Sequence, residues 1–152
     1  MGAIERLIHQ KKFDSEFHKA AISLIYCANE INAHNSEIFK PYDITQQQYN
    51  AIRILRGNKG NTTSVQYIKE RLLDKNSDTS RLIDRLLKIG YVERKICKAD
   101  RRSADIQITE SGLKLLSEID HKIKREFEPL KELNSIELKS LNGLLDKILN
   151  AL

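Results

Sequence analysis

The chain has 152 residues, of which 40% are hydrophobic and 31% charged, with six glycines and two prolines. This length is enough to bury one domain core, and the composition excludes an intrinsically disordered chain and favours a helix-rich globular protein. The formal net charge of +5 favours an anionic partner such as nucleic acid or an acidic membrane surface, with a basic protein that has no such partner as the alternative.

No membrane span is expected, because the sequence contains no apolar run of about 18 residues. The N-terminal segment lacks the apolar centre of a secretory signal. The two cysteines, Cys27 and Cys97, lie far apart and form no CxxC motif. These features fit a cytoplasmic protein in a reducing compartment.

The first predicted helix carries an apolar stripe at spacings of three and four residues: Phe13, Phe17, Ala21, Leu24, Ala28 and Ile31. The pattern fades near residue 35. Because the residue before a proline avoids the helical region, the sequence predicts a loop over 39–43, around Pro41.

Three shorter helices follow. Thr45 and Gln48 have the spacing of a capping box, and the helix that they begin is expected to end at Gly57. A short helix starts at Thr63 or Ser64. A polar turn then leads into a helix over about 77–89, with its inward stripe at Leu82, Ile83, Leu86 and Leu87 and its end at Gly90.

Alternation of apolar and polar residues predicts two strands, over 91–97 and 104–108, joined as a hairpin. Three helices followed by a hairpin are typical of a winged helix-turn-helix, which we place at 45–108. Thr109 is expected to cap the long helix that follows, Pro129 to break it, and Ser135 to cap the last helix, which carries Leu138, Leu141, Leu145, Ile148 and Leu152.

The predicted fold is therefore mainly α with a small β-hairpin: one domain over 1–152, in which the winged helix-turn-helix core is flanked by N- and C-terminal dimerisation helices at 13–34 and 110–152. The terminal stripes resemble coiled-coil seams. We expect them to pair between two copies of the chain in a homodimer. Packing of these helices within one chain is the alternative.

The helix over 77–89 has a polar side suited to DNA. Ser and Thr hydroxyls bind base edges and phosphates, and arginine can bind guanine through two hydrogen bonds. The candidate residues are Ser77, Ser80, Arg81 and Arg85, and an ordinary solvated helix face is the alternative. Asp78 either points aside or accepts a hydrogen bond from a cytosine amino group.

The hairpin tip is the second candidate contact with DNA. Lys98, Arg101 and Arg102 form a cationic finger that suits a narrow minor groove, where negative potential is concentrated. Asp100 is placed to hold Arg102 and pre-aim it, although a surface ion pair of little consequence is the alternative. From position 81 to 102 the chain has eight basic residues and three acidic ones, a balance of +5 that equals the charge of the whole chain.

The runs SRLIDRLLKIGYVERK, DRR, ITESG and ITQQQYNAIRIL resemble the multiple-antibiotic-resistance regulator (MarR) family over about 13–152. The resemblance implies a homodimeric winged-helix transcription regulator, usually a repressor at a palindromic operator. Ser77, Ser80, Arg81 and Arg85 match the recognition helix, and Asp100 and Arg102 match the wing. Many members release DNA when they bind a small, often aromatic, effector. Asp74 and Thr79 stand where the family often has apolar residues.

Three tyrosines, Tyr26, Tyr42 and Tyr49, are candidates to line an effector pocket, although core packing is the commoner role of a single tyrosine. A peroxide-sensing role is not carried over to Cys27, because it lies five residues beyond the matching position. Oxidation of Cys97 is an open alternative to inert packing.

The sequence predicts no enzyme, cofactor or metal site. The four histidines do not have HExxH spacing, and no GxGxxG, phosphate-binding loop or GxSxG motif is present. A protein-interaction module that uses only its helical seams remains as the alternative function.

Overall fold

The structure is a computed structural model that describes residues 2–58, 61–96, 104–126 and 128–152. The chain divides into two compact units, Met1–Leu116 and Ser117–Leu152. The described elements are α1 (Ala3–Leu7), α2 (Glu16–Phe39), the 3₁₀-helix η1 (Lys40–Tyr42), α3 (Gln46–Gly57), α4 (Val65–Arg71), α5 (Thr79–Lys88), β1 (Val92–Ile96), β2 (Ala104–Ile108), α6 (Glu110–Glu126), the 3₁₀-helix η2 (Glu128–Glu132) and α7 (Ser135–Leu149). The prediction of a mainly helical fold with one small hairpin is confirmed.

The N-terminal helical region differs from its prediction at both ends. A short helix, α1, precedes it and is attached to α2 by an ion pair of 2.8 Å between Glu5 and Lys19. At the other end, α2 runs to Phe39 and continues into η1, so the predicted loop at 39–43 is wrong. The helical course is favoured because Phe39 is almost fully buried, with its ring 4.8 Å from that of Tyr49.

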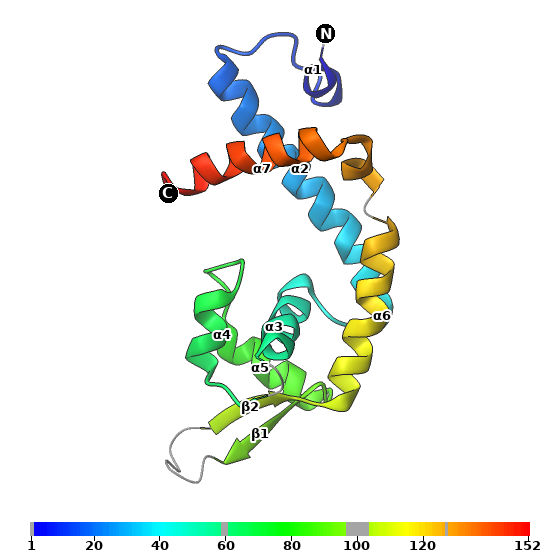
Figure 1. Cartoon of the computed structure of the whole chain (residues 1–152), viewed down its shortest axis with the longest axis vertical. Helices are drawn as coiled ribbons and strands as arrows, with labels where there is room; N and C mark the ends of the chain where they lie inside the picture. Colours follow the sequence, from blue (N-terminus) through cyan, green and yellow to red (C-terminus); the bar gives the residue numbers. More distant parts are fainter. Residues whose placement is uncertain (1, 59–60, 97–103, 127) are drawn as a thin grey trace. The chain divides into compact units, whose positions relative to one another are not determined.

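Helices α3, α4 and α5 group together beside the hairpin (Figure 1). The predicted capping box is confirmed, since the Thr45 hydroxyl accepts from the Gln48 amide and the Gln48 side chain accepts from the Thr45 amide. Ser64 is the N-cap of α4. These caps satisfy amides that a helix start would otherwise leave unpaired. The core of this region consists of buried aliphatic side chains: Ala51, Ile52, Leu55, Ile68, Leu72, Ile83 and Leu86.

The hairpin pairs β1 with β2 in an antiparallel register, with Val92 opposite Ile108 and Arg94 opposite Ile106. Thr63, in the segment before α4, exchanges two backbone hydrogen bonds with Ile106 of β2, at 2.9 and 2.7 Å. The hairpin is therefore tied directly to the helical core.

The junction of α5, the hairpin and α6 is closed by Thr109. Its hydroxyl accepts from the Gly112 amide at 3.1 Å, which confirms the predicted cap, and donates to the Gly90 carbonyl at 2.8 Å. Gly90 has a φ of 82°, a left-handed conformation that glycine adopts without strain. The end of α5 and the start of α6 are thereby held at one point.

In the second unit, α7 begins at Ser135, and its N-cap lies one residue earlier than predicted. Asn134, and not Ser135, is the N-cap, because its side-chain oxygen accepts from the amides of Ile136 and Glu137 while Glu137 completes a capping box. Among the described residues, no helix is long and apolar enough to span a bilayer.

Candidate nucleic-acid interface

Helix α5 starts at Thr79, and its N-cap is Asp78, whose carboxylate accepts from the Arg81 amide at 3.1 Å. At the N-terminus of a helix, a carboxylate accepts from an amide that has no partner within the helix. Its negative charge is also stabilised by the positive end of the helix dipole. Of the two roles predicted for Asp78, this position fits a side chain directed at its own helix. Thr79 is buried, and its hydroxyl donates to the Ser77 carbonyl at 3.4 Å.

Replacing Asp78 tests the importance of this cap. Asp78→Ala is expected to lower the free energy of unfolding by about 1 kcal/mol, because the Arg81 amide loses its partner. Asp78→Asn, which keeps an accepting oxygen, should lie close to the wild type. Chemical denaturation followed by circular dichroism measures both variants, and an alanine variant as stable as the wild type would contradict the assignment.

The two sides of α5 have the predicted polarity. Leu82, Ile83 and Leu86 are buried, whereas Ser80, Arg81 and Arg85 are exposed. Ser77 lies before the helix and is half-buried, with its hydroxyl donating to Asp74 at 3.0 Å. The buried stripe fixes the orientation of α5, so the exposed serine and arginines are presented on a rigid support.

The turn between α4 and α5 is organised by Asp74. Its carboxylate accepts from the Asn76 amide at 2.9 Å and from the Ser77 hydroxyl. These hydrogen bonds hold the pKa of Asp74 below its ordinary value. The bond from the Asn76 amide has the largest effect, followed by the Ser77 hydroxyl, and the Gln47 side chain adds a smaller one. An acid at a position where the family often has an apolar residue thus stabilises the turn that leads into α5.

The arginines of this region differ in their partners. Arg85 pairs with Asp43 at 3.0 Å, and Arg94 of β1 pairs with Asp84 of α5 at 2.8 Å. No described residue forms an ion pair with Arg81. Within the part of the chain that the structure describes, Arg81 is therefore the arginine of α5 whose charge is not compensated by a carboxylate.

The predicted wing contacts, Lys98, Asp100, Arg101 and Arg102, lie outside the described residues, as does Cys97. The described part of β1 places Glu93, Arg94 and Lys95 on its exposed surface. The hairpin itself is confirmed, and the contacts at its tip stay a prediction.

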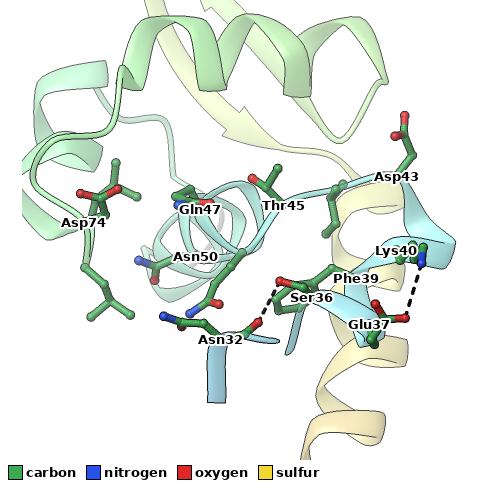
Figure 2. A pocket seen from close by; sticks show the side chains of 14 residues that line it. Asn32, Ser36, Glu37, Phe39, Lys40, Asp43, Thr45, Gln47, Asn50 and Asp74 are labelled. Carbon is green, nitrogen blue, oxygen red and sulfur yellow. Dashed lines mark hydrogen bonds and ion pairs between the residues drawn. The ribbon is translucent and has the colours of Figure 1, made fainter. Parts of the chain in front are cut away.

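A cavity of about 890 Å³ lies between the end of α2, the start of α3 and the turn that precedes α5 (Figure 2). Its lining combines apolar side chains with many amides and a few charges: Asn32, Ser36, Glu37, Phe39, Lys40, Asp43, Ile44, Thr45, Gln46, Gln47, Asn50, Leu72, Leu73 and Asp74. The amides of α3 come from the run QQQYN, a signal that the sequence reasoning did not use.

The three candidate tyrosines do not meet in this cavity. Tyr49 is buried against Phe39, and Tyr42 is half-buried in η1. Tyr26 lines a smaller hollow of about 300 Å³ beside α1, together with the exposed Cys27. The described lining of the larger cavity includes none of the three, so their grouping in one effector site stays a prediction without support from this geometry.

The comparisons with known proteins agree on one family. A MarR-family model matches residues 42–103, from the last residue of η1 to the residue before β2. YdgG of Bacillus subtilis, an uncharacterized HTH-type transcriptional regulator, is 32% identical over 114 residues, or 74% of this chain and 71% of that protein. The crystal structure of a MarR transcription factor from Planctomyces limnophilus is 32% identical over 89% of this chain and 98% of that one, with a TM-score of 0.68. The chain belongs to the MarR family.

A MarR mutant from Escherichia coli, solved in complex with operator DNA, has the same fold. Its TM-score is 0.73 at 22% identity, and the match covers 98% of this chain and 99% of that one. At 22% identity, this similarity shows that the two chains share a fold and nothing further. The sequence resemblance implies that α5 is the recognition helix, and this role stays a prediction.

Proposed function

We propose that this MarR-family protein regulates transcription by binding a palindromic operator in double-stranded DNA as a homodimer, as a repressor in the cytoplasm. The observation that carries the proposal is the exposed row of Ser80, Arg81 and Arg85 on a helix whose other side is locked into the core. The concentration of basic residues from position 81 to 102 supports the same surface. No catalytic step is part of the proposal.

In this proposal α5 enters the major groove. Its first turn faces base edges, where Arg81 binds guanine through two hydrogen bonds and the Ser80 hydroxyl binds a base edge or a phosphate. The wing residues Lys98, Arg101 and Arg102 contact the flanking minor groove, with Asp100 pre-aiming Arg102. In a homodimer the two recognition helices lie about 34 Å apart, one turn of DNA, which is why a palindromic site is expected.

Exposed apolar side chains support the homodimer. On α1 and α2 these are Leu7, Phe17, Leu24 and Ile25, and on α7 they are Ile136, Leu144, Ile148 and Leu149. Phe17 is 85% exposed and Ile136 80%. Large apolar groups left in water on elongated helices are typical of surfaces that a second copy covers.

Arg81→Ala tests the DNA surface. We expect the affinity for a selected operator fragment to fall about tenfold or more, because a bidentate arginine–guanine contact contributes about 1–3 kcal/mol. Lys88→Ala is the matched control, since it removes an equal charge from the last turn of the same helix and should change affinity much less. Fluorescence anisotropy with fragments selected from a random duplex library measures both variants.

The same titrations, repeated at two salt concentrations, separate the proposed function from its alternative. Phosphate contacts release counterions, so the affinity should fall steeply with salt. Arg81→Ala should leave the dimer intact in sedimentation equilibrium. A protein that binds no duplex at low salt, or an Arg81→Ala variant with undiminished affinity, would instead favour the protein-interaction module.

We further propose that a small aromatic effector binds in the 890 Å³ cavity. Phe39, Ile44 and Leu72 offer it an apolar floor, and the amides of α3 offer hydrogen bonds at the rim. Leu72, Leu73 and Asp74 belong to the turn that leads into α5, so a ligand in contact with them acts on the orientation of that helix. This is a route by which an effector releases DNA.

A further inference from the structure

The geometry points to Asp43 as a specificity-determining residue. By holding Arg85, Asp43 prevents that arginine from binding the phosphates of arbitrary DNA sequences. The inference rests on the proposed DNA-binding function. Asp43 lies outside the winged helix unit expected from the sequence, and neither composition nor motif singled it out.

The contact joins residues that are far apart in the chain. Arg85 Nη2 donates to Asp43 Oδ2 at 3.0 Å across 42 positions of sequence, from the middle of α5 to the corner that follows η1. This distance is that of a charge-assisted hydrogen bond. The second half of the recognition helix is therefore joined to the corner between α2 and α3.

The backbone places the carboxylate at this corner. Asp43 has a φ of 51°, in the left-handed region that aspartate and asparagine enter more readily than other non-glycine residues, and its amide donates to the Lys40 carbonyl at 3.2 Å. In Figure 2 the Asp43 carboxylate points away from the amide-bearing side chains of the cavity. The Asp43 carboxylate is thus directed away from these side chains, and it accepts the hydrogen bond from Arg85.

The pair has little to do with stability. The side chains are 54% and 84% exposed, and ion pairs in water contribute little to folding because solvent screens them. Beside DNA, however, the consequences are larger. A carboxylate near the duplex repels every phosphate, whatever the DNA sequence. An arginine that this carboxylate already restrains loses less side-chain entropy when it binds one defined acceptor on the DNA.

The pair is therefore expected to affect how well the protein discriminates between DNA sequences. Arg85 lies on the helix proposed to enter the groove, so without its acidic partner it can bind phosphates on any sequence, and phosphate contacts position a protein without reading bases. Loss of Asp43 should therefore raise the affinity for arbitrary duplexes more than the affinity for the operator. The ratio of the two affinities, and not the affinity for the operator alone, reports the role of Asp43.

Asp43→Asn is the appropriate variant, because asparagine also adopts the left-handed conformation and only the charge is removed. Its control is Asp84→Asn, which removes an equal charge from α5 and releases Arg94, an arginine of β1, in place of Arg85. The third variant is Asp43→Asn in an Arg85→Gln background, in which Asp43 has no arginine to hold. All are made in the full chain, and thermal unfolding establishes that each is folded.

Anisotropy titrations use two duplexes: one selected by the wild-type protein from a random library, and a shuffled duplex of the same composition. With Asp43→Asn we expect affinity for the shuffled duplex to rise roughly three- to tenfold and the affinity ratio to fall by a similar factor, the size expected for one added phosphate contact. Asp84→Asn should leave the ratio near that of the wild type. In the Arg85→Gln background, Asp43→Asn should no longer change the ratio.

An unchanged ratio in Asp43→Asn would overturn the inference and leave the proposed function standing. So would an equal fall in Asp84→Asn, which would reveal a general effect of charge, or a fall that persists without Arg85. If the wild-type protein binds neither duplex, the proposed function fails and the inference fails with it.

Discussion

Leu86→Ala is expected to lower the free energy of unfolding by about 2–5 kcal/mol, the largest effect that we predict for a single substitution. Leu86 is fully buried in the core beneath α5. Truncation removes apolar contacts and leaves a cavity that close-packed neighbours fill only in part. In a chain of 152 residues, a loss of this size corresponds to a decrease in melting temperature on the order of 10 °C.

Leu73→Ala provides the matched control for Leu86→Ala. The chemical change is identical, but the Leu73 side chain is 80% exposed, so the loss of stability should stay within about 0.5 kcal/mol. Scanning calorimetry of both variants at one protein concentration, with urea titrations, measures the difference. Equal losses at the two positions would show that burial in the core beneath α5 does not stabilise the protein as described.

Gly112→Ala is expected to destabilise the protein by about 1–3 kcal/mol, although alanine is normally the better helix former. A Cβ atom at Gly112 would clash with the Tyr91 carbonyl oxygen and lie 2.9 Å from the Ile108 side chain. The carbonyl belongs to the backbone, so relief of this clash requires the start of α6 to move away from the hairpin. Such a movement would also disturb the Thr109 hydrogen bonds at this junction.

Gly57→Ala separates close packing from helix propensity. Gly57 is the last residue of α3, and a Cβ atom placed there meets no atom within 4 Å. The substitution should leave stability unchanged or raise it by up to about 1 kcal/mol. Urea denaturation of both glycine variants provides the comparison, and a Gly112→Ala protein as stable as Gly57→Ala would contradict the close approach of α6 to the hairpin.

Much of the winged unit follows from local sequence signals. The capping box of Thr45 and Gln48, the glycine end of α5, the alternating strands and the Thr109 cap each depend on residues within a few positions of one another. Hydrogen bonds of this kind form in any context that leaves the segment helical or extended. For the same reason the periodic leucines of α5 predicted which side of the helix Arg81 occupies.

Predictions from local sequence were wrong where burial of a side chain in the core favoured a different backbone conformation. The rule for residues before proline predicted a loop at 39–43, but Lys40 is helical and α2 extends to Phe39. Burial of that phenylalanine against Tyr49 contributes more than the preference of a single dihedral angle. The same packing places Tyr49 in the core, and Tyr49 is not among the described residues that line the 890 Å³ cavity.

The sequence by itself determined the family, the order of the helices and the hairpin, and the exposed arginines of α5, because these depend on periodicity and on neighbouring residues. Only the tertiary structure decided that Asp43 pairs with Arg85 and that Asp84 pairs with Arg94. The contact of Asp43 with Arg85 and the amide-lined cavity join segments tens of residues apart. Such juxtapositions arise from the packing of whole helices, for which a single sequence contains no local signal.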